Sequence, residues 1–258
     1  MKISVITVNL NNRSGLEATL SSVLSQDYLD FEYLVVDGGS VDGSVEVIRR
    51  YADQLVWWVS EPDRGTYHAM NKAAERANGD YLLFLNSGDR LLDTSVLRRM
   101  SPHLSGPDIV YGDLRFDSES GATDDVYPDV LTFRYFCRQS LGHPATFIAR
   151  TLFRKWGPYR EEYRICADWV FFIQAICLGS ASYRHVRELI AVFDTTGVSS
   201  QEAYQARIAE ERKQLLENEF AAFYGDYLDG LRLQSELDRI RSSKAYRLLR
   251  KLGVRKFR

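Results

Sequence analysis

Amide and carboxylate side chains follow the apolar segments in the N-terminal part of this sequence. Asn9 comes directly after an apolar run at residues 3–8, Asp37 comes after a run at residues 31–36, and Asp89 comes shortly after another. Such groups can hydrogen-bond the edge of a nucleotide base. Mg²⁺ and Mn²⁺ prefer oxygen ligands, often one or two carboxylates together with substrate phosphates. These residue types therefore indicate a site for a nucleotide and a divalent cation.

The candidate base contacts are Thr7, Asn9 and Asp37, which lie at or near the ends of two predicted strands. An ordinary turn is the alternative interpretation, because Asp-Gly-Gly-Ser at residues 37–40 is also a good turn sequence. The pair Gly38-Gly39 does not match the glycine pattern of a dinucleotide-binding fold.

A second group of candidates surrounds a predicted helix at residues 66–77. Asp63 and Arg64 precede this helix, and Asn71 and Lys72 lie on it. Arg64 or Lys72 could contact a diphosphate, and the N-terminus of a helix itself favours anions. A solvated helix face next to a proline-assisted turn is the alternative.

The segment Asn86-Ser87-Gly88-Asp89 is the candidate metal site, because its carboxylate lies just past a buried strand in a loop that contains glycine. Taken alone, these four residues would also suit a type I turn. The candidate general base is Asp168, which opens an apolar helix. An N-cap aspartate is the ordinary alternative there. His143, followed by a proline, could line the same cleft.

The order of the predicted elements explains why these residues could meet. The predicted strands cover residues 3–8, 31–36, 55–59 and 81–85, and the predicted helices between them cover residues 14–25, 42–51 and 66–77. Ser14 is the expected N-cap of the first helix, with Glu17 at the capping-box position. Alternating strands and helices indicate a parallel sheet with right-handed crossovers. Ligands of such sheets bind at the carboxyl ends of the strands, where the candidate residues fall.

Beyond Asp89 the predicted pattern is less regular. Strands are predicted at residues 109–113 and 146–148, helices at residues 95–104, 151–156 and 168–178, and a hairpin or loop at residues 116–127. From residue 201 onward the chain is charged and predicted to be helical, with a break at residues 225–230.

The composition is that of a globular protein, with 258 residues, 45% hydrophobic residues and a net charge of −2, which argues against a general polyanion binder. Cys137, Cys166 and Cys177 form no metal or redox pattern, and we expect them to be reduced core residues of a cytosolic protein. Neither a signal peptide nor a membrane span is expected, because no basic and apolar leader and no run of 18 apolar residues occurs.

The C-terminal tail is basic. Residues 239–258 contain nine Lys or Arg and no Asp or Glu, interleaved with Leu248, Leu249, Leu252 and Phe257. A basic amphipathic helix can lie on an anionic membrane surface. A solvated helix end or a homodimer contact is the alternative. Nucleic acid is not an expected partner, since no recognition fold accompanies the basic run.

Together these segments resemble the family 2 glycosyltransferases, which have the GT-A fold, and in particular bacterial members that build polysaccharide or lipopolysaccharide. The similar segments run in order through most of the first 190 residues, at residues 5–9, 35–44, 60–72, 79–89, 143–147 and 167–169. The resemblance implies an α/β fold with a mostly parallel, Rossmann-like sheet flanked by helices, followed by a C-terminal helical extension.

The resemblance also implies an activity. It is the transfer of a sugar, with inversion, from a nucleotide-diphosphate donor, UDP-sugar by preference, to a hydroxyl of a glycan or lipid-linked acceptor. Asp89 would bind Mn²⁺ or Mg²⁺, Asp168 would be the catalytic base, and His143 and Trp169 would lie on the acceptor side. The implied donor contacts are Thr7, Asn9, Asp37, Asp63, Arg64, Asn71, Lys72, Asn86 and Ser87.

Three positions depart from the family pattern. Asn86 replaces the first acid of the D-x-D metal motif, so that metal is expected to be held less tightly and to bind only together with the donor. Val170 stands where relatives often have a second acid after the base, and His68 stands where they often have aspartate.

The expected organisation is a catalytic domain at residues 1–198, with a donor half (1–89) and an acceptor half (90–198), and a helical extension at residues 199–258. The expected location is the cytoplasmic face of the bacterial plasma membrane. Two other functions remain open. One is a catalytically silent nucleotide-sugar-binding partner in a glycan-assembly complex, suggested by the single carboxylate. The other is a nucleotidyltransferase, although residues 9–15 offer only Arg13 and one glycine to hold a triphosphate.

Overall fold

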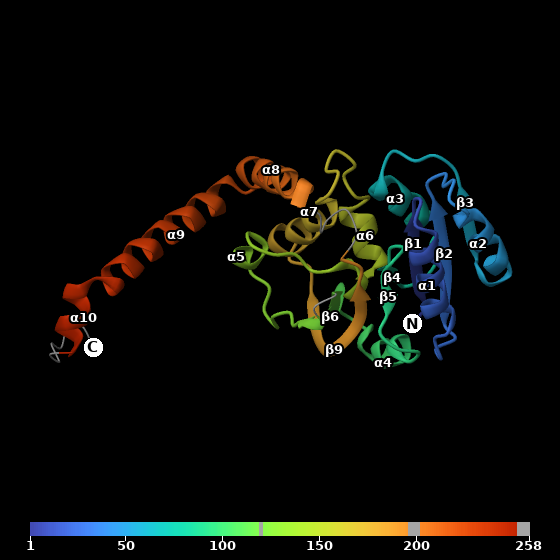
Figure 1. The fold of residues 1–258 in the computed structure, drawn as a ribbon, viewed down its shortest axis with the longest axis horizontal. Coiled ribbons are helices and arrows are strands. Elements are labelled where there is room, and N and C mark those ends of the chain that lie inside the picture. The colour runs from blue at the N-terminus through green and yellow to red at the C-terminus, as the bar shows by residue number, and fades with distance from the viewer. Residues whose placement is uncertain (119–120, 196–201, 252–258) are drawn as a thin grey trace. The chain divides into compact units, whose positions relative to one another are not determined.

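The structure is a computed structural model that describes residues 1–118, 121–195 and 202–251 (Figure 1). The chain forms two compact units, Met1–Glu211 and Arg212–Arg258. The first unit contains the predicted α/β fold, and the described part of the second unit is helical.

One mixed sheet forms the centre of the first unit. The strands follow the order β3-β2-β1-β4-β8-β6-β9-β5, and β7 pairs with β6. The strands of the described residues are β1 (Ile3–Asn9), β2 (Phe31–Asp37), β3 (Trp57–Ser60), β4 (Tyr81–Phe84), β5 (Arg90–Leu91), β6 (Ile109–Ser118), β7 (Gly121–Asp125), β8 (Thr146–Ala149) and β9 (Tyr183–Phe193). Figure 1 shows β1, β2 and β3 next to one another and β6 beside β9.

Helices and single turns connect these strands. The helices are α1 (Arg13–Leu24), α2 (Ser44–Tyr51), α3 (Thr66–Arg76), α4 (Val96–Met100), α5 (Phe133–Phe136), α6 (Arg150–Trp156) and α7 (Ala167–Ile173). The 3₁₀ turns are η1 (Ala52–Gln54), η2 (Ser101–His103) and η3 (His143–Ala145), and the π-helical turn η4 (Gln174–Leu178) extends α7. Helices α1 and α2 pack against each other on one face of the sheet, and right-handed crossovers place α3 on the other face.

The register of the first strands places the candidate residues side by side. Strand β1 pairs in parallel with β2 from Ile3 opposite Phe31 to Asn9 opposite Asp37. All seven residues of β1 are buried, as expected for a strand with helices over both faces. The predicted βαβ order over the first 85 residues is therefore confirmed.

The later strands bring more carboxyl ends to the same edge of the sheet. Strands β4 and β6 are both antiparallel to β8, so they run in the same direction, and β9 is parallel to β6. Strands β1, β2, β3, β4, β6 and β9 therefore all end at one edge. The sequence prediction contained no strand at β9, although its apolar residues Val186, Ile190 and Val192 fall partly on alternate positions.

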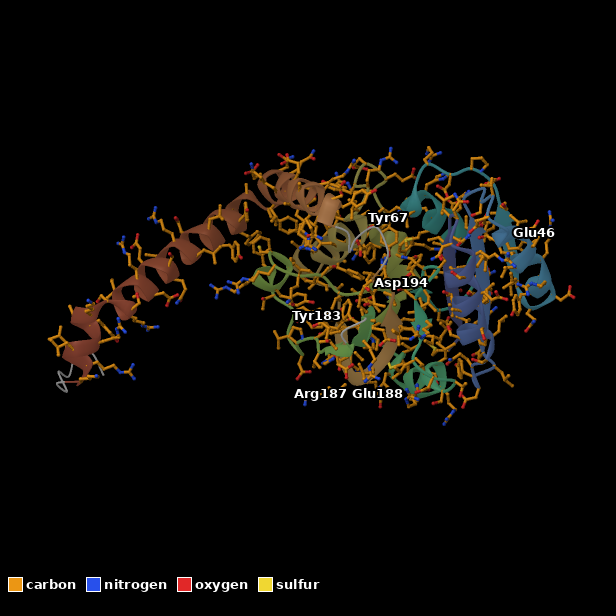
Figure 2. All side chains as sticks on the ribbon, in the orientation of Figure 1. Glu46, Tyr67, Tyr183, Arg187, Glu188 and Asp194 are labelled. Atoms are coloured by element: carbon orange, nitrogen blue, oxygen red, sulfur yellow. The ribbon has the colours of Figure 1, made fainter. Side chains whose placement is uncertain are left out.

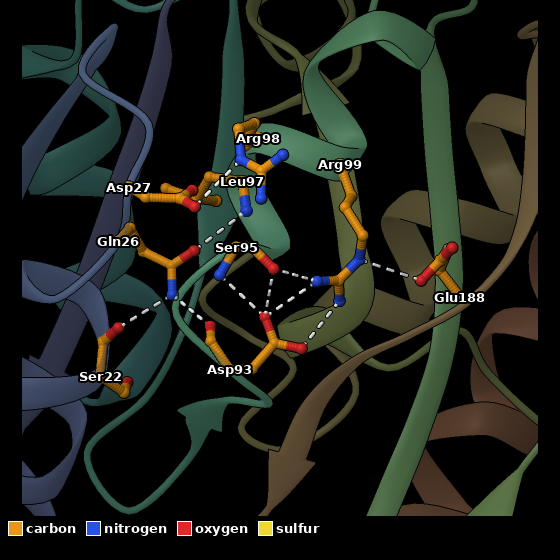
Figure 3. Close-up of polar contacts among 9 residues, drawn as sticks. All are labelled: Ser22, Gln26, Asp27, Asp93, Ser95, Leu97, Arg98, Arg99 and Glu188. Atoms are coloured by element: carbon orange, nitrogen blue, oxygen red, sulfur yellow. Dashed lines mark hydrogen bonds and ion pairs between the residues drawn. The ribbon is translucent and has the colours of Figure 1, made fainter.

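A polar network ties the segment after β5 to β9 and to the C-terminal end of α1 (Figure 3). The Asp93 carboxylate accepts hydrogen bonds from Ser95 and from both terminal nitrogens of Arg99, whose Nε donates to Glu188 of β9 at 3.2 Å. The amide of Gln26 donates to the Asp93 carbonyl at 2.6 Å and accepts from the backbone N–H of Leu97. This network holds the chain just beyond Asp89 against the strand that ends at residue 193.

Some predicted details are wrong. Helix α1 is capped by Asn12, whose side chain accepts from the N–H of Gly15 at 3.1 Å, and not by Ser14. Glu17 pairs with Arg50 of α2 instead of closing a capping box. Asparagine is as good an N-cap as serine, and Asn12 comes first along the chain. Strand β6 is longer than the predicted 109–113, whereas its antiparallel pairing with β7 agrees with the hairpin predicted at residues 116–127.

The cysteines are free in the described residues, but only Cys166 is buried, and Cys137 and Cys177 are half-buried. The expectation that all three are core residues therefore holds for one of them.

The second unit contains the rest of α8 (Glu202–Glu219), then α9 (Ala221–Ser242) and α10 (Lys244–Lys251). The predicted break at residues 225–230 is wrong, because α9 continues through it and the helices separate at Phe220. An exposed glycine costs a helix only about 1 kcal/mol, which a long helix tolerates. Across the described ranges, no helix combines the length and the apolar composition needed to cross a bilayer.

Candidate active site

The first cluster of site residues lies where β1 and β2 end. Asp37 is fully buried, and its carboxylate accepts hydrogen bonds from Asn9 Nδ2 (2.7 Å), Ser60 Oγ (2.6 Å) and Ser40 Oγ (2.6 Å). It also accepts from the backbone N–H groups of Gly39 and Ser40. Burial raises the pKa of Asp37, but the hydrogen bonds from Ser40, Ser60 and Asn9 outweigh it and hold the pKa below its ordinary value.

Asp37 therefore organises the strand ends from within as an ionised group. Thr7 is also fully buried, and its hydroxyl pairs with the Tyr33 hydroxyl (2.9 Å) and donates to the Leu85 carbonyl (2.7 Å). In this conformation Thr7 and Asp37 use their polar atoms inside the protein. Their contact with a nucleotide stays a prediction.

The cations predicted to bind the diphosphate are paired with carboxylates. Arg64 donates to Glu161 through Nε and Nη2 at 3.1 and 2.9 Å. Lys72 contacts Glu61 at 2.9 Å. Both carboxylates would have to be exchanged for phosphate oxygens if these cations bind a donor.

Two more predicted donor residues have local contacts. Asn71 is buried and holds Tyr159 through both of its amide atoms, donating to the carbonyl at 2.9 Å and accepting from the N–H at 2.8 Å. Asp63 accepts from the N–H of Gly65 at 2.8 Å and so shapes the turn before α3. Asn71 therefore holds the backbone of Tyr159 in place. Asp63 stabilises the turn before α3, and its carboxylate lies beside Gly38.

The second cluster surrounds Asp89, which is only 3% exposed. Its carboxylate accepts a hydrogen bond of 2.8 Å from the backbone N–H of Asp194, directly after β9. Burial raises the pKa of Asp89 to about 7, and the nearby Asp194 carboxylate adds to that rise, although the backbone hydrogen bond opposes it. A buried carboxylate beside another acid gains from a cation.

Gly88 is the residue that lets Asp194 approach. Its φ of +108° lies in the left-handed region, where a side chain is strained. A Cβ on Gly88 would also lie 2.1 Å from Asp194 Oδ2. The N–H of Gly88 is held by the hydroxyl of Thr19 at 3.0 Å, and that hydroxyl in turn donates to the Asp89 carbonyl.

The oxygen atoms around this loop fit a hard divalent cation that is shared with a ligand. Asp89 and Asp194 supply two carboxylates, and Asn86 Oδ1 is a buried amide oxygen with no hydrogen-bond partner. Within the described part of the chain, no cluster of three His, Cys, Asp or Glu could hold a metal by itself. Two carboxylates together with substrate phosphates are a common way to bind Mg²⁺ or Mn²⁺. Ser87 lies in the same loop, and its backbone carbonyl accepts a hydrogen bond from Asn12 Nδ2.

The third cluster holds Asp168, the second residue of α7. The Tyr67 hydroxyl lies 2.8 Å from Asp168 Oδ1 and 2.6 Å from the Ile165 carbonyl. His143 Nδ1 lies 3.9 Å from Asp168 Oδ2, and the Asp168 side chain is 21% exposed. One oxygen of this carboxylate is therefore oriented by a tyrosine, while the side chain as a whole remains reachable.

His143 connects this carboxylate to the sheet. Its ring is buried, its Nε2 pairs with the Tyr159 hydroxyl at 2.8 Å, and it packs on Phe84, the last residue of β4, at 5.3 Å between ring centres. Burial lowers the pKa of His143 more than Asp168 raises it, so the ring is neutral at pH 7. His143 thus links Asp168 to the strand that leads to Asp89.

Trp169 does not face this cluster with its polar atom. Its side chain is 1% exposed, and Nε1 donates to the Phe136 carbonyl at 2.8 Å. Its acceptor-side role stays a prediction, and its visible role is to anchor α7 in the core.

Two residues of the site were absent from the sequence prediction. Asp194 follows an apolar strand like the other strand-end acids, so detection of β9 would have found it. Tyr67, labelled with Asp194 in Figure 2, lies on α3, 101 residues before Asp168. A buried tyrosine on an amphipathic helix gives no local signal of such a partner.

Comparison with known proteins agrees with this fold. The family described as Glycosyl transferase family 2 matches residues 4–155. The PGL/p-HBAD biosynthesis glycosyltransferase of Mycobacterium bovis is 32% identical over 203 residues, which are 75% of this chain and 77% of that protein. The chain therefore belongs to glycosyltransferase family 2.

Solved structures show the same fold at low sequence identity. TarS 1-349 of S. aureus, in complex with UDP-GlcNAc, aligns with a TM-score of 0.60 and 20% identity over 75% of this chain, and this chain spans only 58% of its length. The mannosyltransferase PcManGT of Pyrobaculum calidifontis, in complex with GDP-Man and Mn²⁺, aligns with a TM-score of 0.59 and 17% identity over 95% of this chain and 82% of that one. These similarities identify the fold as that of the GT-A glycosyltransferases.

Proposed function

We propose that this chain is an inverting, metal-dependent glycosyltransferase that moves a sugar from a nucleoside-diphosphate donor to a hydroxyl of a glycan or lipid-linked acceptor in bacterial surface polysaccharide synthesis. The observation that carries the proposal is the partly exposed carboxylate of Asp168, oriented by Tyr67 beside the strand that leads to Asp89. A UDP-sugar is the favoured donor, supported by the UDP-GlcNAc complex of the TarS neighbour.

Asp168 acts as the general base. Tyr67 occupies its Oδ1, so the acceptor hydroxyl approaches the other oxygen, which faces His143. Neutral His143 leaves that carboxylate without a strong cationic partner, so it remains able to accept a proton. As Asp168 takes its proton, the acceptor hydroxyl attacks the anomeric carbon from the side opposite the leaving diphosphate, which inverts the configuration there.

Asp89 and Asp194 are the residues that would hold a divalent cation for the diphosphate of the donor. When bound, Mn²⁺ or Mg²⁺ stabilises the negative charge of the departing diphosphate. The Mn²⁺ in the complex of the PcManGT neighbour supports this assignment. Burial and the nearby Asp194 carboxylate raise the pKa of Asp89 to about 7, so a cation bound there would favour its ionised form.

The remaining donor contacts follow from the strand ends. Asn9 and Asp37 lie side by side where β1 and β2 end, and they define the base side of the site. Arg64 and Lys72 supply positive charge after β3, once Glu161 and Glu61 release them. Asn86 and Ser87 line the loop between the base side and the metal.

The tail binds the enzyme to an anionic membrane surface, where a lipid-linked acceptor is found. Helix α10 carries Lys244, Arg247, Arg250 and Lys251, and Leu248 beside them is 58% exposed. Such a helix can bury its apolar side chains among lipid headgroups while its cations contact anionic lipids. Residues 252–258, which extend the basic run, lie outside the described residues. A homodimer contact through the same helix is the competing role.

The silent-partner alternative rested on a metal site with one carboxylate. The approach of Asp194 to Asp89 supplies a second acid and favours an active enzyme. The enzyme would release nucleoside diphosphate slowly from its donor in the presence of Mn²⁺, and a silent partner would bind the donor without releasing it.

Thermal-shift screening of UDP-, GDP- and dTDP-sugars with Mn²⁺ tests the donor assignment, because a bound ligand raises the melting temperature by mass action. Asp168→Asn then tests the chemistry. We expect the variant to bind the selected donor within about twofold of the wild type, but to lose transfer by about a thousandfold or more. Full transfer activity in Asp168→Asn would refute the assignment of the base.

A further inference from the structure

A carboxylate from α8, more than 40 residues further along the chain, binds the loop that leads to Asp168. Glu211 of α8 accepts hydrogen bonds from three consecutive backbone N–H groups: those of Arg164 (2.9 Å), Ile165 (3.0 Å) and Cys166 (3.1 Å). Its Oε1 also accepts from Arg207 Nε at 2.9 Å. The Glu211 side chain is 9% exposed.

This contact fixes the backbone just before α7. The N-cap residue of the helix is Cys166, whose own side chain makes no capping hydrogen bond. Of the three N–H groups that Glu211 binds, that of Cys166 belongs to the start of the helix, where N–H groups need acceptors and an anion is favoured, and the other two belong to the loop before it. Burial raises the pKa of Glu211, but the hydrogen bonds from Arg207 and the three N–H groups outweigh it, so Glu211 is ionised at neutral pH.

The same loop is held from its other side by Tyr67. The Tyr67 hydroxyl bonds the Ile165 carbonyl, and Glu211 bonds the Ile165 N–H. Tyr67 also bonds Asp168, only three residues further on. The backbone that sets the position of Asp168 is therefore fixed between α3 and α8.

We propose that Glu211 is a positioning residue for catalysis, which holds residues 164–166 so that the Asp168 carboxylate meets the acceptor hydroxyl. The inference rests on the proposed role of Asp168 as the base. It also means that the part of α8 up to Glu211 is a working part of the active site and not only a connection to the C-terminal helices. Misplacing a catalytic group by about 1 Å can cost about 100-fold in rate.

The test compares Glu211→Gln with Glu210→Gln. Both variants remove one negative charge from α8, but Glu210 is exposed. Glutamine at 211 keeps one acceptor oxygen for the four donors and turns an NH₂ group toward them. Full-length proteins are assayed with Mn²⁺ for nucleoside diphosphate release from UDP-GlcNAc, UDP-glucose and GDP-mannose, and for calorimetric binding of UDP and GDP.

For Glu211→Gln we expect kcat to fall by about 10- to 100-fold, while the dissociation constant and the stoichiometry of nucleotide binding stay within about twofold. Glu211→Asp, which keeps the charge on a shorter side chain, should lie between Glu211→Gln and the wild type. Glu210→Gln should match the wild type. A contribution to folding alone would instead lower the binding stoichiometry and the melting temperature without lowering kcat per binding-competent molecule.

The double variant Glu211→Gln/Asp168→Asn shows whether Glu211 acts through Asp168. Its rate should equal that of Asp168→Asn alone, because groups that act as a unit are not additive. Amide hydrogen exchange supplies a measurement that needs no substrate, and Glu211→Gln should speed exchange at residues 164–166.

Unchanged kcat or unchanged exchange in Glu211→Gln, with Asp168→Asn inactive, would overturn this inference and leave the proposed function intact. The same conclusion would follow if the double variant were slower than Asp168→Asn by the factor that Glu211→Gln causes alone. An active Asp168→Asn would instead overturn the proposed base, and with it the role of Glu211.

Discussion

The backbone N–H of Asp194 donates a hydrogen bond of 2.8 Å to the carboxylate of Asp89, 105 residues earlier in the chain. Two acids from the ends of separate strands are thereby brought together at the carboxyl edge of the sheet. Gly88 makes this approach possible, since any side chain there would collide with Asp194. The polar network between Asp93, Arg99 and Glu188 holds the segments that carry the two acids.

Asp194→Asn is expected to weaken Mn²⁺-dependent donor binding by about tenfold, because the cation loses one of two charged ligands and each tenfold corresponds to about 1.4 kcal/mol. Titration of UDP with and without Mn²⁺ measures the effect. Asp124→Asn, which alters an exposed acid on β7, is the control and should bind as the wild type does. Equal Mn²⁺ enhancement in Asp194→Asn and the wild type would exclude Asp194 from the metal site.

Asp89 makes stability depend on pH with a defined sign. Its pKa is raised to about 7 in the folded protein and is about 3.9 in an unfolded chain. Between those values the folded state keeps a proton that the unfolded state has lost, so stability without metal falls as pH rises from about 4 to 7. Asp89→Asn removes this loss, and we expect it to be more stable at pH 8 by on the order of 1 to 4 kcal/mol.

Asp93→Asn is the control for this experiment, because the pKa of Asp93 is shifted in the direction opposite to that of Asp89. The hydrogen bonds from Arg99 lower the pKa of Asp93 to about 2, although its side chain is 45% exposed. Its contribution is complete above about pH 4 and is lost as the pH falls toward 2, so Asp93→Asn should cost a constant amount, below about 1 kcal/mol, between pH 5 and 8. Urea unfolding curves across this range measure both variants. A stability gap between Asp89→Asn and the wild type that does not widen from pH 5 to 8 would contradict the prediction.

Tyr67→Phe should lower transfer by about tenfold and leave donor binding unchanged, because Asp168 loses the hydrogen bond that orients it. The Ile165 carbonyl shares the single proton of the same hydroxyl and also loses this contact, so a stability loss of about 1 to 2 kcal/mol is expected. Tyr81→Phe removes a hydroxyl that donates to the Pro107 carbonyl at the start of β4, and it should keep full activity. If transfer by Tyr67→Phe equals that of the wild type, Tyr67 does not orient the base.

Removal of residues 239–258 is expected to release the protein from vesicles that contain anionic lipid, since each basic residue near such a surface contributes about 1 kcal/mol. Co-sedimentation with phosphatidylglycerol vesicles measures the effect, and pure phosphatidylcholine vesicles serve as the control. Binding of the full chain should also fall at high salt. Equal sedimentation of the full and shortened chains would favour a role of the tail in contacts between copies, which size-exclusion chromatography with light scattering would detect.

The alternation of strands and helices was predictable from the sequence because each element carries its own hydrophobic period and end signals. The buried strands at residues 3–9 and 31–37 are apolar throughout, and parallel pairing places Asn9 next to Asp37 whatever the details of the loops. The sequence was less informative where several residues compete for one local role. Asn12 and Ser14 are both good N-caps, and only the structure shows that Asn12 caps α1.

By itself, the sequence determined the α/β architecture, the strand-end placement of Asp37 and Asp89, and the aspartate at the start of α7. The tertiary structure alone decided which distant residues complete the site. Asp194 reaches Asp89 because β9 inserts beside β6, and Tyr67 reaches Asp168 because α3 packs near α7. Hydrophobic periods encode which side of an element is buried, but they do not encode which partner from a hundred residues away will cover it.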